Sequence, residues 1–280
     1  MSANTTPVLE TALRAARAGG ELALARLGRP GYEKRKGPRD VTAGAILEVQ
    51  QRIVDAIRQD FPEAHFLVEE SEAAQDEDAD PLWIVDPIDG SLNFLHGIPI
   101  FAVSLAYRQA GLYRLGVVYD PCRGELFQAV SGRGAFLNDR PIHVDHFSDG
   151  REAWEQAVVG TDWRGNDLEL RKAMQVARYL AAETFQLLTF GSPALGLCYV
   201  AAGRLHAYYG LDALKLWDVA AGAVILQEAG GIFTNIAGSA WQHARGGYIA
   251  SNNVIHGWVQ RVAGAVLSLY RDEAAPQPAA

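Results

Sequence analysis

Apolar residues recur at helical spacing near the start of the chain, at Leu9, Leu13, Ala16, Gly20, Leu24 and Leu27. A repeat of three or four residues predicts an amphipathic helix, which Gly28 and Pro30 should end. A second helix is predicted from about 44 to 60, where the apolar positions are Ile46, Val49, Ile53 and Ile57. Each helix should therefore turn one apolar face toward a core.

Short strand-like runs follow one another from Phe66 to Val130. Turn residues separate them at Gly97, Gly111, Asp120 with its following proline, and Gly124. This arrangement predicts that the two opening helices pack on a sheet that is rich in antiparallel pairs.

The second half of the chain alternates between the two periods. Strands are predicted near 157–160, 187–190, 205–209, 232 and 248, and helices over about 167–182, 192–202, 217–228 and 254–271. Such alternation is typical of layered sheets and helices, so the fold class is expected to be α/β (α+β). We expect an N-terminal α+β lobe over residues 1–150, a C-terminal α/β lobe over 151–272, and a disordered tail over 273–280.

Composition narrows the class of protein. At 280 residues and 49% hydrophobic content, the chain can bury a large core without covalent crosslinks. Only Cys122 and Cys198 are present, far apart in sequence, which favours buried thiols in a reducing compartment. No secretory pattern opens the chain and no apolar stretch reaches membrane length, so we expect a cytoplasmic protein with no membrane association. The formal net charge of -8 argues against nucleic acid as a partner.

The most informative stretch is Trp83–Ser91, because it places two carboxylates three residues apart. The apolar run before Asp86 predicts a buried strand, and Pro87 is expected to end it. Asp86 and Asp89 then project from a sharply turned backbone. Two such carboxylates suit a hard metal ion, although a pair of ordinary turns between strands would give the same residues.

The residues after Asp89 suit an anion. Gly90 allows an unusual φ or a close approach, and the amides of Gly90, Ser91 and Leu92 can open a short helix whose N-terminus attracts phosphate. Ligands for a metal ion and donors for a phosphate are therefore predicted at one point of the chain.

Two further acidic segments extend this pattern. Glu69 and Glu70 follow a short apolar strand, and adjacent carboxylates repel each other unless solvent or a cation compensates. Asp218 opens a predicted helix that runs to Glu228, at a position where an acid commonly acts as the N-cap. Solvent exposure and helix capping are the alternative interpretations of these acids.

Together the segments Glu69–Glu70, Asp86–Ser91 and Trp217–Gly222 resemble the inositol monophosphatase family of metal-dependent, lithium-sensitive phosphomonoesterases. The likeness continues through residues 116–121, 132–136 and 250–253, and covers about residues 30 to 260. The resemblance implies an αβαβα sandwich of the inositol monophosphatase and fructose-1,6-bisphosphatase type, with the site between the lobes. It also implies a homodimer.

The resemblance implies a site for Mg²⁺. One ion is expected on Glu69, Asp86 and the main-chain carbonyl of Ile88, and a second on Asp86, Asp89 and Asp218. All of these ligands are oxygen atoms, which Mg²⁺ prefers.

The same resemblance suggests roles for the neighbouring residues. Glu70 and the Ser91 hydroxyl are expected to orient or deprotonate the attacking water, and the amides of Gly90 and Ser91 to hold the phosphate. These residues would complete a metal-assisted hydrolysis of a phosphate monoester.

The chain also departs from the family pattern. Ala45 stands where the family usually has an aspartate that contributes to a third metal, which puts a third ion in doubt. Leu211 stands where inositol phosphatases carry a glutamate, so Asp212 or Lys215 could face the substrate instead. His96 follows the phosphate turn and is a candidate for substrate contact, with a structural hydrogen bond as the alternative.

Three functional hypotheses follow. The first is a Mg²⁺-dependent phosphatase for an inositol, sugar or polyol monophosphate. The second is a nucleotide 3′-phosphatase or fructose-1,6-bisphosphatase of the same superfamily, which would need a basic pocket for a second phosphate. The third is a non-catalytic binding or regulatory protein, for which Ala45 is the only argument.

Overall fold

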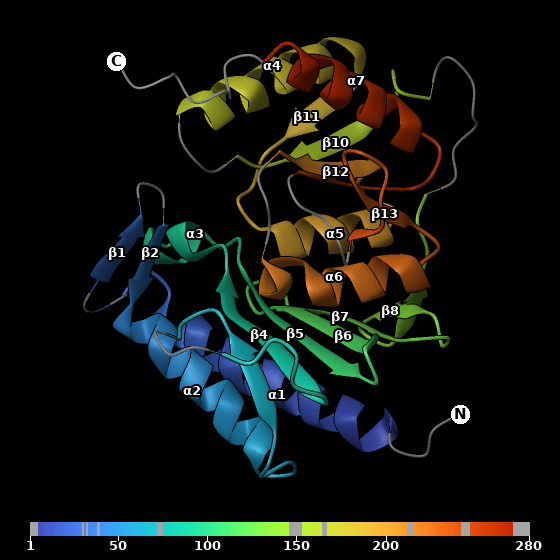
Figure 1. Ribbon diagram of the computed structural model, residues 1–280. Coiled ribbons are helices and arrows are strands. Elements are labelled where there is room, and N and C mark those ends of the chain that lie inside the picture. The colour runs from blue at the N-terminus through green and yellow to red at the C-terminus, as the bar shows by residue number, and fades with distance from the viewer. Residues whose placement is uncertain are drawn as a thin grey trace, which may run out of the picture.

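The computed structural model describes residues 5–29, 31, 33–37, 40–71, 75–145, 153–163, 167–211, 215–241 and 247–270. The predicted tail over 273–280 and the candidate Asp212 lie outside these residues. Five layers make up the described part of the chain, alternating between helices and sheets (Figure 1). The layered αβαβα sandwich expected from the resemblance is therefore confirmed.

Helices form the two outer layers and the central one (Figure 1). One outer pair packs on the seven-stranded sheet, the other pair covers the five-stranded sheet, and the central pair lies between the sheets. The pair on the seven-stranded sheet is α1 (Thr5–Arg26) and α2 (Gly44–Arg58). The pair on the five-stranded sheet is α4 (Asp167–Glu183) and α7 (His256–Ser268), and the central pair is α5 (Pro193–Ala201) and α6 (Leu216–Glu228).

The seven-stranded sheet has the order β3-β4-β5-β6-β7-β8-β9. Only the β3–β4 pair is parallel, so the antiparallel-rich sheet predicted for the first half is confirmed. Its strands are β3 (His65–Val68), β4 (Leu82–Asp89), β5 (Ala102–Gln109), β6 (Leu112–Asp120), β7 (Glu125–Val130), β8 (Ala135–Leu137) and β9 (Arg140–Ile142). A separate pair, β1 (Glu33–Gly37) and β2 (Asp40–Ala43), is antiparallel.

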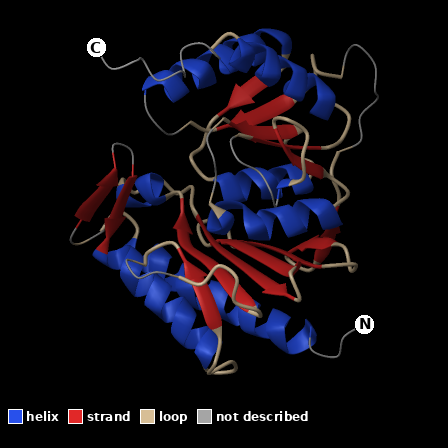
Figure 2. Cartoon of the chain, viewed as in Figure 1, coloured by secondary structure: helices blue, strands red, loops and turns tan. Residues whose placement is uncertain are grey.

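The five-stranded sheet has the order β11-β10-β12-β14-β13 and mixes both kinds of pairing. Strand β10 is parallel to β11 and β12, whereas β14 is antiparallel to β12 and β13. The strands are β10 (Val158–Thr161), β11 (Gln186–Leu188), β12 (Ala207–Gly210), β13 (Ile232–Asn235) and β14 (Tyr248–Ser251). All five were predicted to within a few residues. Figure 2 shows how the two sheets alternate with the helices.

The two opening helices form because their apolar stripes have a sheet to cover. All four apolar positions predicted for α2, from Ile46 to Ile57, are buried against the seven-stranded sheet. Helix α1 begins at Thr5, earlier than its apolar stripe suggested, and the chain leaves it through Gly28 at a φ of 68°. Burial of one face of each helix provides the main stabilisation, since in proteins most helical stability comes from the packing of an apolar face.

The prediction that Pro87 ends the strand was wrong. Strand β4 continues to Asp89, and its pairing with β5 shifts register between Asp86 and Asp89. Proline lacks only the N–H donor, and an irregular position in a ladder does not require that donor. The proline therefore lies at a bulge inside β4, and this bulge sets the direction in which the side chains of Asp86 and Asp89 point.

The central helices are buried on nearly all sides because sheets lie on both faces of their layer. Helix α6 has an unbroken run of buried residues from Asp218 to Leu226. Cys198 in α5 is buried and Cys122 is half-buried, and both are free thiols, as the sequence predicted. In the described part of the chain, no helix is both long and apolar enough to cross a bilayer.

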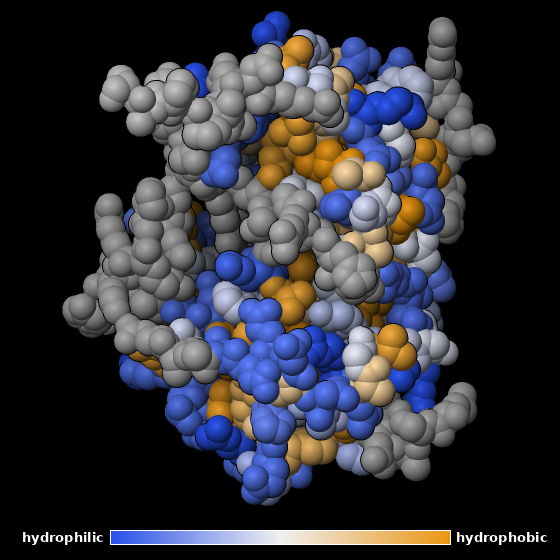
Figure 3. All heavy atoms as spheres, viewed as in Figure 1, coloured by the Kyte–Doolittle hydropathy of each residue, from blue (hydrophilic) through white to orange (hydrophobic). Residues whose placement is uncertain are grey.

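The surface over the outer helices is largely polar. In Figure 3 hydrophilic residues cover much of the lower face, over α2, and hydrophobic residues appear as separate patches. This is the ordinary surface of a folded domain, in which scattered apolar residues remain exposed.

Candidate metal and phosphate site

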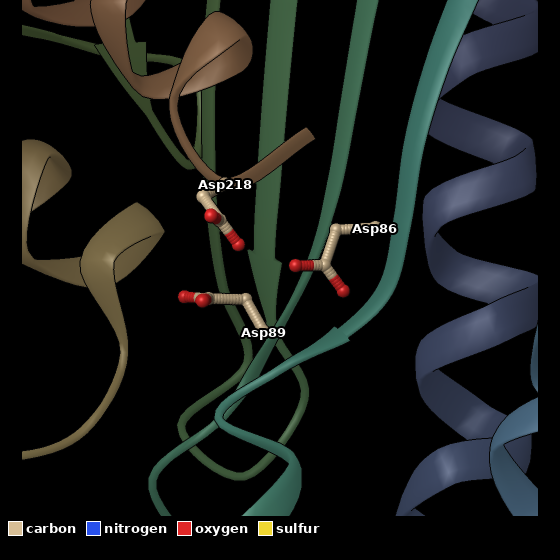
Figure 4. Close-up of side chains that lie close together, drawn as sticks. All are labelled: Asp86, Asp89 and Asp218. Carbon is tan, nitrogen blue, oxygen red and sulfur yellow. The ribbon is translucent and has the colours of Figure 1, made fainter. Parts of the chain in front are cut away.

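Three buried carboxylates meet where the first sheet adjoins the central helices. Asp86, Asp89 and Asp218 are 1%, 2% and 3% exposed, and each offers an oxygen within 4.8 Å of the other two. Figure 4 shows Asp86 and Asp218 facing each other across a short gap, with Asp89 beside them. The end of β4 and the first turn of α6 thus bring together residues that are far apart in sequence.

Asp86 and Asp218 each accept a hydrogen bond from a backbone amide of a nearby residue. Asp86 accepts a hydrogen bond from the amide of Ile88, with a nitrogen-to-oxygen distance of 2.9 Å. Asp218 accepts from the amide of Lys215, also at 2.9 Å. The N-cap residue of α6 is Lys215, so the alternative interpretation of Asp218 as the N-cap does not hold, although its carboxylate does accept from the cap amide. Asp218 lies at the third helical position, from which an acid can reach back to the cap amide.

Asp89 is held by the start of α5. Its Oδ2 atom accepts a hydrogen bond from the amide of Ala194 at 2.9 Å and another from the hydroxyl of Ser192. Ser192 is the N-cap of α5 and Pro193 is its first residue. The positive end of this helix therefore faces the Asp89 carboxylate, which favours the ionised form.

The negative charges of the three carboxylates favour the binding of a cation. Burial, followed by the negative charges of Glu69, Asp89 and Asp218, raises the pKa of Asp86 well above its ordinary value. Buried carboxylates at this spacing repel one another, and a divalent ion with oxygen ligands removes that repulsion. The donor set therefore fits a hard cation such as Mg²⁺.

Glu69 and Glu70 lie at the edge of this cluster. Both are half-buried at the end of β3, where the Glu69 amide donates to the carbonyl of Val85 in β4. The backbone of Glu70 makes two hydrogen bonds with the side chain of Gln50 in α2, each 3.1 Å long. These bonds fix the backbone of the acid pair beside β4, and Glu69 is close enough to shift the pKa of Asp86.

The turn after Asp89 is built around Gly90. This residue has a φ of 97° and is the N-cap of α3 (Ser91–Leu95), so the predicted short helix is confirmed. A β-carbon at position 90 would lie 2.9 Å from the carbonyl oxygen of Ile100 and 3.1 Å from that of Gly191. Only glycine fits a backbone that is both left-handed and this crowded.

The other candidate residues lie on β4, at the two ends of α3 and immediately before α6. Ile88 is buried between Asp86 and Asp89, and Ser91 is half-buried at the start of α3. His96 is exposed at the opposite end of α3, and Lys215 is exposed immediately before α6. Contact of His96 or Lys215 with a substrate stays a prediction.

Two sites of departure from the family pattern lie among apolar residues, Ala45 buried and Leu211 half-buried. Ala45 is part of the core between α2 and the seven-stranded sheet. Leu211 packs against the core between the five-stranded sheet and its outer helices. Neither position therefore offers the site an oxygen ligand from its side chain.

Sequence reasoning missed the residues that support Asp89. The pair Ser192–Pro193 is a recognisable helix start, since serine favours the N-cap and proline the first turn. Its link to Asp89 spans 103 residues and leaves no local signal. Asp162, whose carboxylate binds the amide of Gly191 just before Ser192, was missed for the same reason.

An αβαβα sandwich that holds buried carboxylates between a glycine turn and a central helix is the arrangement expected of the metal-dependent phosphatases that the sequence resembles. Residues 4–268 match the inositol monophosphatase family. The chain belongs to this family, whose members are metal-dependent.

Relatives of the chain carry several names. It is 38% identical over 253 residues to the Nus factor SuhB of Pseudomonas aeruginosa, covering 88% of this chain and 92% of that protein. It is 35% identical over 260 residues to the fructose-1,6-bisphosphatase/inositol-1-monophosphatase of Thermotoga maritima, covering 92% and 96%. The solved structure of a Thermotoga maritima IMPase superimposes with a TM-score of 0.84 at 34% identity, covering 94% of this chain and 99% of that one.

Proposed function

We propose that the protein is a Mg²⁺-dependent phosphatase that hydrolyses a small phosphate monoester, an inositol, sugar or polyol monophosphate. The observation that carries this proposal is the convergence of Asp86, Asp89 and Asp218 beside the Gly90 turn. Membership of the inositol monophosphatase family supports the reaction class.

The ligands proposed for two Mg²⁺ ions are Glu69, Asp86, the carbonyl of Ile88, Asp89 and Asp218. When bound, the ions supply charge neutralisation for the phosphate and lower the pKa of water. Carboxylates shared by the ions must be ionised, and the amides on Asp86, Asp89 and Asp218 stabilise that form.

The remaining residues are proposed to handle the water and the phosphate. Glu70 and the Ser91 hydroxyl orient the water, and Glu70 accepts its proton as the water oxygen attacks phosphorus. The amides of Gly90 and Ser91 donate to the phosphate oxygens. The bond from phosphorus to the ester oxygen then breaks, and the alcohol leaves with a proton from solvent.

The leaving group is the least defined part of the substrate. Leu211 stands where inositol phosphatases carry a glutamate, and it is half-buried among apolar residues. This position therefore offers no carboxylate to the hydroxyls of an inositol ring. Lys215 is exposed beside the start of α6, where its charge is available to an anionic or polyhydroxylated group. This arrangement supports a sugar or polyol phosphate at least as well as myo-inositol phosphate.

The names of relatives suggest the second and third candidates. The Thermotoga maritima protein is named for two phosphatase activities, which keeps fructose-1,6-bisphosphate among the substrates to test. The Pseudomonas aeruginosa protein is named a Nus factor, which keeps a regulatory binding role open. The cluster of three buried carboxylates favours the enzyme, because side chains that are 1–3% exposed can hold a metal ion but cannot form a binding surface for another protein.

Phosphate release from a panel of esters, with and without Mg²⁺, tests the proposal. The panel holds inositol 1-phosphate, glycerol 2-phosphate, fructose 1,6-bisphosphate and adenosine 3′,5′-bisphosphate. Mg²⁺-dependent release from a monoester is expected, whereas preference for either bisphosphate would select the second candidate. No release from any ester by a protein that binds Mg²⁺ would overturn the phosphatase and favour the regulatory role.

Three further properties belong to the same proposal. We propose inhibition by lithium, a homodimer and a cytoplasmic location, each implied by the family. Light scattering tests the dimer, and phosphate release at increasing Li⁺ tests inhibition. We also propose that residues 1–150 and 151–272 act as two lobes around the site, since Asp86 and Asp89 come from the first and Asp218 from the second.

A further inference from the structure

The loop Phe190–Ser192 is tethered at three successive residues. The carbonyl of Phe190 accepts a hydrogen bond of 2.7 Å from the side-chain amide of Asn93 in α3. The amide of Gly191 donates to Oδ1 of Asp162 at 2.8 Å, and the hydroxyl of Ser192 donates to Asp89. The loop therefore connects the β4–α3 turn to the five-stranded sheet.

Asp162 is held in turn by Tyr208. The second carboxylate oxygen of Asp162 accepts a hydrogen bond from the Tyr208 hydroxyl. Tyr208 lies in β12 and is fully buried, and its pKa is raised well above the ordinary value by burial and by the charge of Asp162. The phenol thus keeps its proton and acts as a donor.

The ring of Tyr208 cannot move easily. A β-carbon at Gly196 in α5 would lie 2.5 Å from this ring, and one at Gly160 in β10 would lie 2.6 Å from it. The ring also packs on Phe190, with centroids 5.7 Å apart. Two glycines therefore leave a slot that the ring fills, and its hydroxyl is a fixed point.

The far end of this chain of contacts sets the orientation of a proposed metal ligand. Oδ2 of Asp89 accepts from both the Ser192 hydroxyl and the Ala194 amide. Two donors on one oxygen fix the rotation of the carboxylate about its last bond, and so they also fix the direction of the other oxygen. Supporting contacts of this kind change metal affinity by about 10- to 100-fold when they are lost.

We propose that Asp162 and Tyr208 are a positioning pair that sets the orientation of Asp89, and through it the affinity of the site for a divalent cation. Neither residue binds the metal or the substrate. The proposal rests on the metal site of the proposed function, but it does not depend on which ester is hydrolysed or on whether any is.

Three variants test the pair. The measurement is a titration of the metal-free protein with Mg²⁺ at constant temperature, followed by tryptophan fluorescence, because Trp217 is next to Asp218. Asp162→Ala removes the acceptor for Gly191 and Tyr208, and we expect the Mg²⁺ concentration at the midpoint of the binding curve to rise about tenfold. Tyr208→Phe removes only one hydroxyl and should raise it several-fold. Asp162→Asn keeps one oxygen, which can accept from the Gly191 amide or from the Tyr208 hydroxyl but not from both, so its midpoint should lie between those of the original protein and of Asp162→Ala.

A matched control separates positioning from simple stability. Asp120 is another buried aspartate, and it accepts hydrogen bonds from the amides of Cys122 and Arg123 rather than from the loop. Asp120→Ala should lower the melting temperature without moving the Mg²⁺ midpoint. Hydrogen exchange of the segment 186–195 in metal-free protein should become faster in Asp162→Ala and stay unchanged in Asp120→Ala.

Each other outcome has a defined meaning. If Asp162→Ala lowers the melting temperature but leaves the Mg²⁺ midpoint unchanged, the role is only structural and the proposal is overturned. If Asp162→Asn raises the Mg²⁺ midpoint about tenfold while Tyr208→Phe leaves it unchanged, the charge of Asp162 itself acts at the site, which also overturns the proposal. A lack of any Mg²⁺ response in the original protein would remove its basis. Failure of ester hydrolysis with the expected midpoints would overturn the proposed function alone.

Discussion

Gly116 in β6 lies directly against Ala221 in α6, with space for a hydrogen atom but not for a methyl group. A β-carbon at position 116 would lie 3.0 Å from the α-carbon of Ala221 and would overlap its carbonyl oxygen. Because Asp218 lies one turn earlier on the same helix, this contact determines how deeply the metal ligand sits. The contact between the seven-stranded sheet and α6 therefore determines the position of Asp218 in the site.

Gly116→Ala should destabilise the protein, because the helix backbone cannot move without disturbing the core on its other face. We expect a loss of about 2–3 kcal/mol in the free energy of unfolding, measured with urea, which is at the upper end for overpacking. Gly264→Ala in α7 is the control, since a β-carbon there meets nothing. It should gain up to about 1 kcal/mol from helix propensity. Equal stability of Gly116→Ala and the original protein would contradict the contact.

Asp218→Asn should reduce phosphate release by at least about 100-fold, because a neutral amide is a poor ligand for Mg²⁺. The amide oxygen can still accept from the Lys215 amide, so the start of α6 should persist. Release from a responsive monoester and the Mg²⁺-induced rise in melting temperature are the measurements. Asp120→Asn, a buried aspartate outside the cluster, is expected to keep both. A Mg²⁺ response of normal size in Asp218→Asn would count against its role as a ligand.

Gly90→Ala should damage the site as well as the fold. The φ of 97° and the two carbonyl oxygens near position 90 leave no room for a side chain. We expect a loss of about 2–3 kcal/mol in stability and of more than tenfold in phosphate release. Gly124→Ala shares a positive φ, 63°, but its β-carbon would meet nothing. It should cost about 1 kcal/mol and leave phosphate release unchanged. Equal effects of the two variants would show that strain alone matters.

His256 should make stability depend on pH between about 4 and 6.5. Its two ring nitrogens each lie 2.9 Å from a hydroxyl oxygen, those of Ser251 and Thr234, and burial lowers its pKa from 6.5 to about 4. In this window the unfolded chain binds more protons than the folded one, so stability falls as the pH falls.

The expected loss is about 2 kcal/mol between pH 7.5 and pH 5, measured by urea unfolding at each pH. His256→Gln removes the titrating ring, so its stability should vary less over the same range. The carboxylates, including Asp86 with its raised pKa, are common to both proteins, so the difference between the two slopes reports His256. The same slope in both proteins would refute the assignment to His256.

The local sequence pattern was enough to predict elements that any apolar surface can stabilise. Helix α2 was predicted from its apolar stripe, because any sheet that covers Ile46, Val49, Ile53 and Ile57 stabilises it. The pattern was wrong where one neighbour decides the outcome. β4 passes Pro87 because β5 tolerates a register shift there.

The candidate site divides in the same way. Asp86, Asp89 and Asp218 were found because the combination of their segments resembles a known family, although each segment alone has an ordinary interpretation. Their convergence within 4.8 Å was inferred from family likeness, and the structure supplied it. Nothing local pointed to Ser192 or Asp162, since contacts across the fold leave no periodic pattern.

By itself, the sequence determined the family, the class of fold and the acidic residues around which the site is built, because periodicity and residue chemistry are properties of short segments. Only the tertiary structure decided how Asp89 is oriented, how closely Gly116 approaches Ala221 and which tyrosine supports Asp162. These relationships depend on the packing of side chains from different layers at distances of a few ångströms, and a linear order of residues does not specify such distances.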